Sequence, residues 1–437
     1  MQSWTALCYH LNQTVLNPAG ARCPTEPALH RSGAGPALSE AEGADAPTPK
    51  GKVRVAMKIG IPCEVKKGET RVALVPSMVG ELSGLDAQVL VEKGAGSKAC
   101  FSDQRYQDAG AQVVPDATSL YQQTDVIIKV QPPTFNETLK SHELDLMLEG
   151  ITLIGFLSPT TNRELVERLL SKRITAFSME LMPRISRAQG MDALSSMSTV
   201  AGYKAVLLAT QYSGKFFPLL MTAAGTIPPS TVLIIGAGVA GLQAIATAKR
   251  LGARVEAFDT RPAVKEQVES LGARFVEMEL SKETETDGGY AKEISPEFIK
   301  KEMEAIGSRL PKSDVVVSTA LVFGKRAPLL ITEEMVKTMH EGSVIIDLAA
   351  EQGGNCELTQ PGEVVQKHGV TICGPINLPS SMPVHASQMY SRNITNLVTH
   401  LYQAKNRQLD FTDEITRSCC VCSNGELLSE VVKGAFL

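Results

Sequence analysis

Residues 231–259 read TVLIIGAGVAGLQAIATAKRLGARVEAFD, and this stretch decides the fold of the chain. An apolar run ends at Gly236, a helical pattern follows Gly238 and Gly241, and a second apolar run ends at Asp259. Glycines between a strand and a helix permit a tight turn and close approach to a pyrophosphate, which the helix N-terminus stabilises. The stretch therefore predicts a βαβ unit of the Rossmann type that binds a dinucleotide, rather than a turn that binds nothing.

The acidic residue at the end of this stretch predicts which dinucleotide is bound. A carboxylate at Asp259 accepts hydrogen bonds from the adenosine ribose hydroxyls and repels a 2′-phosphate, which favours NAD over NADP. Arg261 weakens this preference, because an arginine near this position can hold a 2′-phosphate. A Rossmann unit by itself leaves the reaction open.

Short β-rich runs alternate with helical patterns on both sides of this stretch. One series runs from KIGIP at Lys58 to ITAFSME at Ile174, and the other runs from TVLIIG to VTICG at Val370. This alternation predicts parallel sheets with helical crossovers. We expect an α/β fold of two doubly wound Rossmann-like domains with a cleft between them. The expected domains are residues 57–194 plus 377–437 for the first, and residues 195–376 for the NAD-binding second.

Local signals support this organisation. Asn162 is suited to cap a helix, and the helical patterns that begin at Ala201 and near Asn393 are expected to connect the domains. The apolar face of the capped helix comprises Leu165, Val166, Leu169 and Leu170. Asn424 and Gly425 predict the turn of a hairpin near the C-terminus.

The composition is that of an ordinary globular protein, with 437 residues, 43% hydrophobic residues and a formal net charge of -4. Charges of both signs are interspersed, so neither a nucleic-acid-binding face nor a polybasic membrane segment is expected. The most apolar stretch contains the glycines of the turn, and no membrane span is expected. Nine cysteines at irregular spacing indicate a reduced compartment. Cys419 and Cys422 form a CxxC without a second pair or a nearby histidine, so no metal site is expected.

Residues 1–56 lack periodicity, and residues 32–50 have the small, Pro/Gly-rich composition of a disordered segment. Acidic residues are missing before Glu26, as in a transit peptide, but Arg22 is the only arginine there and no amphipathic pattern is found. Three interpretations remain: a transit peptide, a flexible extension, and a true start at Met57.

Residues 182–205, MPRISRAQGMDALSSMSTVAGYKA, are dense in polar groups at the expected domain junction. Taken alone, they indicate a polar linker. They closely resemble the Arg-Gln-Asp loop of the NAD-binding component of proton-translocating transhydrogenases, and the likeness extends over residues 57–437. It includes the motifs GETRVALVP, GAGVAGLQAIATAKRLGA, GGYAKE, SVIIDLAAE and EQGGNCE. The resemblance implies hydride transfer between NAD(H) on this chain and NADP(H) on a partner subunit.

The resemblance also implies the site residues. Arg184, Gln189, Asp192 and Ser195 would surround the nicotinamide, with Gln189 holding two dihydronicotinamide rings in register. Such a transfer moves no proton to or from a substrate and needs positioning instead of acid–base groups. Arg184 and Asp192 would orient each other as a charge pair, and Ser195 would hydrogen-bond the carboxamide. The expected cofactor-binding residues are Arg184, Ile185, Ser186, Gln189, Gly190, Met191, Asp192, Gly236, Gly238, Val239, Gly241, Asp259, Thr260, Arg261, Gly289 and Leu321.

A polar, glycine-containing loop occupies residues 279–298, where a short crossover would suffice. One interpretation is a tolerated surface insertion. The resemblance implies instead a mobile lid that closes over bound NAD, with Gly289 beside the nucleotide and Tyr290, assigned to the catalytic set, at its tip.

Alanine dehydrogenases share this architecture and are the first alternative. They need a histidine for proton transfer, together with a lysine and an arginine for the substrate. Arg71 and Lys129 match the latter two, but Ser158 stands where that family's pattern calls for histidine, so we expect structural roles for Arg71 and Lys129 and a surface position for His142. The second alternative, a non-catalytic NADH-binding module, leaves the polar loop without a purpose.

The resemblance implies partners and location as well. We expect an NADP-binding subunit and membrane-embedded transhydrogenase subunits that translocate protons, a homodimer of this chain, and no nucleic acid. The expected location is cytoplasmic and peripheral to the inner membrane through these partners, or the mitochondrial matrix in a eukaryote. Since the sequence ends at Leu437 without membrane helices, a separate NAD-binding polypeptide of the bacterial kind is expected.

Overall fold

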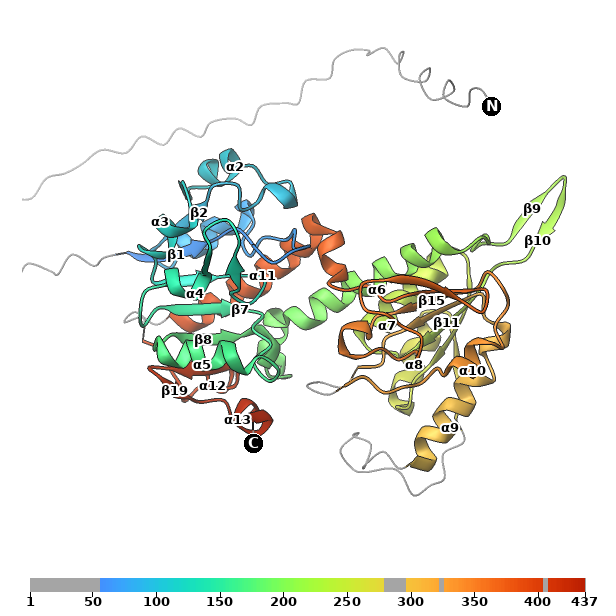
Figure 1. Cartoon of the computed structure of the whole chain (residues 1–437). Helices are drawn as coiled ribbons and strands as arrows, with labels where there is room; N and C mark the ends of the chain where they lie inside the picture. Colours follow the sequence, from blue (N-terminus) through green and yellow to red (C-terminus); the bar gives the residue numbers. More distant parts are fainter. Residues whose placement is uncertain (1–55, 279–295, 322–325, 404–407, 437) are drawn as a thin grey trace, which may run out of the picture. The chain divides into compact units, whose positions relative to one another are not determined.

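Two mainly parallel β-sheets with accompanying helices form the framework of the chain (Figure 1). The computed structural model describes residues 56–278, 296–321, 326–403 and 408–436. The eight-stranded sheet has the order β19 (Glu426–Leu427), β18 (Cys420–Ser423), β8 (Thr175–Ser178), β7 (Thr152–Gly155), β4 (Val126–Ile128), β1 (Met57–Ile61), β2 (Ala87–Glu92) and β3 (Gln112–Val114). The seven-stranded sheet has the order β13 (Arg274–Val276), β12 (Arg254–Phe258), β11 (Thr231–Ile235), β14 (Val315–Ser318), β15 (Val344–Asp347), β17 (Val370–Cys373) and β16 (Val364–Lys367). The predicted two-domain α/β fold is confirmed.

Short helices connect the strands of the eight-stranded sheet. They are η1 (Pro76–Met78), α1 (Val79–Ser83), η2 (Ser97–Ala99), α2 (Asp103–Asp108), α3 (Ala117–Tyr121), α4 (Glu143–Leu146), α5 (Arg163–Ser171), η3 (Met179–Leu181), α12 (Glu414–Cys419) and α13 (Glu430–Phe436), with a small hairpin of β5 (Phe135–Asn136) and β6 (Ser141–His142). The predicted cap is confirmed, because the Asn162 side chain accepts a hydrogen bond from the Leu165 amide at 3.3 Å. The predicted hairpin is also confirmed: β18 pairs antiparallel with β19, and Asn424 and Gly425 both have positive φ.

The strands of the seven-stranded sheet are parallel except for β16, which pairs antiparallel with β17. The associated helices are α7 (Val239–Arg250), η5 (Pro262–Val264), α8 (Lys265–Ser270), α9 (Pro296–Gly307), η6 (Leu310–Lys312), α10 (Glu333–Val336), η7 (Ala350–Gln352) and η8 (Leu378–Ser381). A separate hairpin of β9 (Leu220–Thr222) and β10 (Gly225–Ile227) is almost wholly exposed, and Figure 1 shows it as a projecting ribbon.

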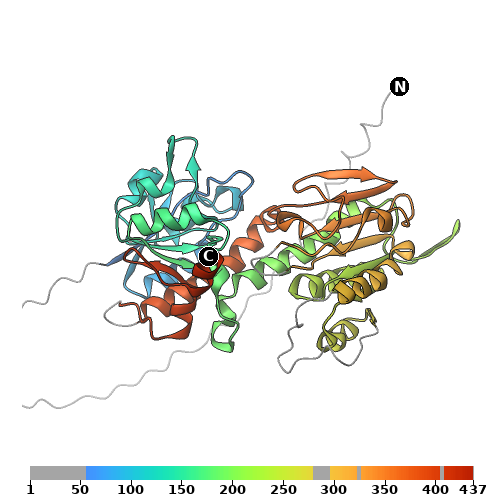
Figure 2. The ribbon, with the colours of Figure 1, turned by 60° about the horizontal axis from the view of Figure 1, so that its bottom comes forward.

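Two helices of 20 residues, α6 (Ala193–Tyr212) and α11 (Pro383–Tyr402), lie side by side (Figures 1 and 2). Met197, near the start of α6, belongs to the hydrophobic core of the eight-stranded sheet, whereas Ala205 and Ala209 belong to that of the seven-stranded sheet. A single helix therefore contributes to both cores. The predicted domain boundaries, and the predicted cleft, stay predictions.

Several expectations fall outside the described residues. Gly289 and Tyr290, with the lid to which they were assigned, lie in residues 279–295, and all but one residue of the N-terminal segment 1–56 is also outside. In the part of the chain that the structure does describe, no helix combines the length and the apolar character needed to cross a bilayer.

Candidate functional site

The glycine-rich turn between β11 and α7 has the shape that its sequence predicts. Gly236 has a φ of 91°, and a Cβ built on it would lie 2.7 Å from the Thr319 hydroxyl oxygen. A Cβ on Gly241 would lie 1.8 Å from the Gly236 carbonyl oxygen, so these two glycines are required for the turn to close. A Cβ on Gly238 would meet nothing within 4 Å. Open space thus lies at the residue that precedes α7, where a helix N-terminus favours a phosphate.

Asp259 lies next to this turn and is held by four hydrogen bonds. Its carboxylate accepts from the Ala237 amide at 2.7 Å and from the amide, Nε and Nη2 of Arg261, each at 2.9 Å. Burial would raise the pKa of Asp259, but the bonds from Arg261 and Ala237 outweigh it, and the pKa is lowered. The four acceptor positions of a carboxylate are therefore filled. A ribose hydroxyl must displace a donor, and the half-exposed Arg261 side chain is the one that can leave.

A buried polar network fixes the adjacent ends of β14 and β15. Asn355 accepts hydrogen bonds from the Ser318 hydroxyl at 2.7 Å and from the Ala320 amide at 3.1 Å. Its own amide donates to Asp347 at 2.8 Å, and both side chains are completely buried. Leu321 follows this network directly and is exposed. The EQGGNCE motif thus supplies the asparagine that anchors the backbone at this edge of the sheet.

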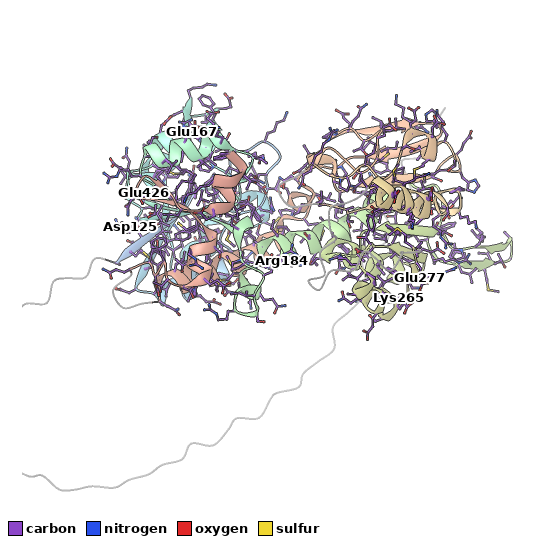
Figure 3. All side chains as sticks on the ribbon, turned by 90° about the horizontal axis from the view of Figure 1, so that it is seen from below. Asp125, Glu167, Arg184, Lys265, Glu277 and Glu426 are labelled. Carbon is purple, nitrogen blue, oxygen red and sulfur yellow. The ribbon has the colours of Figure 1, made fainter. Side chains whose placement is uncertain are left out.

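The polar loop ends where Asp192 caps α6. One Asp192 oxygen accepts from the Ser195 amide at 2.9 Å, and the other accepts from the Ser195 hydroxyl at 2.6 Å. Arg184, labelled in Figure 3 on the segment that leads into α6, is exposed and forms no ion pair with any described residue. The predicted Arg184–Asp192 charge pair is therefore wrong for this structure, because the first turn of α6 uses the carboxylate as its N-cap.

Gln189 lies in η4 (Ser186–Met191) and is exposed. The next carbonyl, that of Gly190, accepts hydrogen bonds from the side-chain amides of Asn393 and Asn396, both at 2.9 Å. Helix α11 thereby fixes the backbone beside Gln189 while the glutamine side chain stays accessible. Sequence reasoning missed this clamp, although the spacing of the two asparagines places them on one face of a helix.

The remaining residues predicted to bind the nucleotide differ in exposure. Ser186, Gly190 and Val239 are exposed, Ile185 and Thr260 are partly buried, and Met191 packs into the core of the eight-stranded sheet.

Helices α6 and α7 meet at a glycine, and this contact relates the polar loop to the glycine-rich turn. A Cβ on Gly202 would lie 2.1 Å from the Ala240 carbonyl oxygen in the first turn of α7. Gly202 is seven residues beyond Ser195, which corresponds to about 10 Å along α6. The loop and the turn are thus held at neighbouring helix ends. The sequence signal for this close approach is a glycine inside a helical pattern.

Comparison with known proteins identifies the family. The model of the alanine dehydrogenase/PNT N-terminal domain matches residues 60–201, and that of the C-terminal domain matches residues 205–430. The chain belongs to the alanine dehydrogenase/PNT family. It is 50% identical over 382 residues to the first of the polypeptides named NAD(P) transhydrogenase subunit alpha in Rhodospirillum rubrum, a match that covers 86% of this chain and 99% of the relative.

Structural comparison agrees with the family assignment. A transhydrogenase crystal structure from Sinorhizobium meliloti, 36% identical, matches with a TM-score of 0.74 over 85% of this chain and 99% of that chain. An L-alanine dehydrogenase structure, 29% identical, matches with a TM-score of 0.73 over 87% and 99%. In sequence, alanine dehydrogenase from Staphylococcus haemolyticus is 32% identical over 75% of this chain and 82% of the relative.

The family contains two kinds of enzyme, so the residues that match the alanine dehydrogenase pattern are informative. Arg71 donates from Nε and Nη2 to Glu69 at 2.8 and 2.6 Å, and from Nη2 to Asn377 at 2.9 Å. Lys129 is completely buried and lies 2.7 Å from Glu143 and 3.4 Å from a Glu64 oxygen. Burial opposes the charge of Lys129, but these carboxylates outweigh it and raise its pKa. Both cations are thus committed to carboxylates of the chain, which supports the structural roles expected for them.

Ser158 occupies the position of the expected histidine. Its φ of 47° and a hydrogen bond of 2.8 Å from its amide to Glu180 fix its backbone. His142 is partly buried, and its Nδ1 accepts from the Leu144 amide at 3.1 Å, which makes it a helix cap instead of the surface histidine expected.

The seven cysteines that the structure describes are free thiols. Cys419 and Cys422 are completely buried, and burial raises the pKa of Cys422 to about 12. Their thiols contact backbone carbonyls, with Sγ to oxygen distances of 2.9 Å to Ile415 and 3.5 Å to Ile174. These contacts support a packing role.

Proposed function

We propose that this chain is the NAD(H)-binding component of a proton-translocating transhydrogenase. NAD(H) binds at the glycine-rich turn and Asp259, and hydride passes directly to or from NADP(H) on a partner subunit. Membrane-embedded subunits couple this transfer to proton translocation. The transhydrogenase relatives support the proposal, since they match over nearly their full length.

The observation that carries this proposal is the contrast between the closed pairs and the open loop. Arg71 and Lys129, which an alanine dehydrogenase would use on its substrate, are saturated by buried carboxylates. Gln189, in contrast, is exposed on a backbone fixed by α11. A neutral amide on a rigid support suits the alignment of two rings, a step that requires no proton transfer.

The remaining residues support NAD(H) binding as follows. The open space at Gly238 accommodates the pyrophosphate at the N-terminus of α7, and Asp259 binds the adenosine ribose hydroxyls once Arg261 moves aside. When bound, the nicotinamide supplies the hydride. Arg184 is free of partners among the described residues and is available to the nucleotide, while Ser195 stays oriented by Asp192.

Substitution of Gln189 by alanine tests this function. NADH affinity, measured by fluorescence titration, should change by no more than a few-fold, because the turn and Asp259 remain intact. Single-turnover hydride transfer to NADP(H) on the partner subunit should fall at least tenfold, which corresponds to about 1.4 kcal/mol in the barrier.

The matched control is Arg187→Ala. Arg187 lies in the same short helix, but its side chain pairs with Asp413 at 3.1 Å. This variant should transfer hydride at the wild-type rate. Normal transfer by the Gln189 variant, with partner and both nucleotides saturating, would refute the alignment role.

Cofactor choice has a separate test. The wild-type chain should bind NADH much more tightly than NADPH, since Asp259 repels a 2′-phosphate. Titration with both nucleotides measures this, and equal affinities would contradict the assignment of the site.

We also propose a homodimer and a peripheral location. Apolar side chains are exposed on and beside the β9–β10 hairpin, namely Phe216, Leu219, Met221 and Ile227. An exposed apolar patch of this kind favours a protein–protein contact. Light scattering should find a dimer that Met221→Glu weakens, and a wild-type monomer would contradict the proposal. Through its partners the chain would lie at the inner membrane, on the cytoplasmic side or, in a eukaryote, on the matrix side.

A further inference from the structure

A second carboxylate lies beside the proposed ribose site. Glu302 belongs to α9, and Ile306 of the same helix packs into one core with Phe258, the last residue of β12. This packing places α9 against the strand that ends next to Asp259. The Glu302 side chain is partly buried, and within the described residues it has no hydrogen bond and no ion pair.

The cations near Glu302 are committed elsewhere. Arg261 is bound to Asp259, and Arg309, which follows α9, lies 3.8 Å from Glu256. On α9 itself, Lys300 lies 3.9 Å from Glu304. The other charged groups on the packed elements are Lys301, Lys312, Glu333, Glu334 and Lys337, of which the last pairs with Glu333 and Glu334. Glu302 is therefore left without a compensating cation, apart from those outside the described residues.

The charge balance at this site is consequently negative. Asp259 and Arg261 neutralise each other in a two-pronged pair, and Glu302 adds one further negative charge when ionised. Burial and the charge of Asp259 raise the pKa of Glu302 to about 7. The extra charge is thus present above neutral pH and is lost below it.

We propose that Glu302 is a second specificity-determining residue, which acts with Asp259 to exclude a 2′-phosphate from the nucleotide site. This inference rests on the proposed NAD(H) site. A phosphate monoester carries a charge of about −1.5 to −2 at pH 7 and is repelled by a carboxylate that no cation offsets. The ribose diol of NADH is uncharged, so Glu302 discriminates through the phosphate and leaves NADH binding largely unaffected.

The pairing of Arg261 completes the explanation. An arginine at this position weakened the sequence-based preference for NAD, because it could hold a 2′-phosphate. In the structure its Nε and Nη2 are both directed to Asp259, and a phosphate would have to compete with that carboxylate while facing Glu302. The presence of Arg261 is therefore compatible with exclusion of NADP(H).

Glu302→Gln tests the proposal, because the amide retains the size of the side chain and removes its charge. We measure dissociation constants for NADH and NADPH on the full chain at pH 6, 7 and 8. At pH 8 the variant should bind NADPH at least fivefold more tightly than wild type, with NADH affinity within twofold. The difference between variant and wild type should shrink as Glu302 becomes protonated toward pH 6. Titration of the 2′-phosphate itself is common to both proteins and cancels in this comparison.

Glu304→Gln is the matched control, since it removes a charge from the same helix at an exposed position. It should leave both affinities within twofold. If Glu302→Gln matches wild type in NADPH affinity at pH 8, or if Glu304→Gln has the same effect, the specific role of Glu302 is refuted. Failure of wild-type chain to bind NADH would instead refute the proposed function, so the two failures are distinguishable.

Discussion

The chain contains two arginine–carboxylate pairs with the same local design and different surroundings. Arg71 and Glu69 are two residues apart, as are Arg261 and Asp259, and in each pair Nε and Nη2 bind the two carboxylate oxygens. The side chains of the first pair are only 3% and 0% exposed. In the second pair, Arg261 is 51% exposed and Asp259 is 6% exposed.

This difference separates a structural pair from one that can exchange partners. Glu69 also accepts from Gln131 and Asn377, and Arg71 also donates to Asn377, so opening this pair would leave several buried groups unsatisfied. Arg261 can swing into solvent, where water satisfies its donors. Asp259 is thus available to a ligand, whereas Glu69 and Arg71 are not.

The largest expected effect comes from breaking the buried pair. Arg71→Ala leaves Glu69 buried without its partner, and the free energy of unfolding should fall by about 3–5 kcal/mol. Urea unfolding followed by circular dichroism measures this loss. A loss below about 1 kcal/mol would show that the pair behaves as an exposed one.

The pH dependence of stability should sharpen the same contrast. Burial would raise the pKa of Glu69, but bonds from Arg71 and Gln131 outweigh it and lower the pKa from 4.5 to about 2. Because the folded-state pKa is depressed, this stabilisation is present above pH 4.5 and is lost as the pH falls toward 2. The advantage of wild type over Glu69→Gln should therefore shrink by about 2 kcal/mol between pH 5 and 3. An advantage that stays constant over this range would contradict the assigned pairing.

A smaller effect is expected at the exposed pair. Arg261→Ala should lower the free energy of unfolding by less than about 1 kcal/mol, since half-exposed ion pairs contribute little. The same urea titration compares it directly with Arg71→Ala. Equal losses for the two variants would remove the distinction between a closed and an open pair.

The smallest expected effect, none, concerns alanine chemistry. Ser158→His restores the side chain of the alanine dehydrogenase pattern, but Arg71 and Lys129 remain bound to Glu69 and Glu143. Neither wild type nor the variant should oxidise alanine with NAD, or reduce pyruvate with ammonia and NADH. Turnover by the variant, followed by NADH absorbance, would show that the two cations can be released to a substrate.

Local signals predicted much of the fold and some of the candidate site. The turn at Gly236, the cap at Asn162 and the hairpin at Asn424 were predicted, because each depends on residues within a few positions of one another. The Arg184–Asp192 pair was predicted wrongly, because Asp192 is bound by the helix that follows it. The clamp from α11 on Gly190 joins residues more than 200 positions apart, and no local pattern encodes that contact.

By itself the sequence determined where the chain turns and which residues stand at the nucleotide site, since glycine conformation, helix capping and strand periodicity are local properties. Only the tertiary structure decided which charges are closed and which remain open. Arg71 is closed by Asn377, 306 positions away, and by burial in a core that distant segments build. Arg261 and Asp259 lie instead at the exposed end of β12. The strength of an ion pair depends on the surrounding water, and the whole fold determines how much water remains.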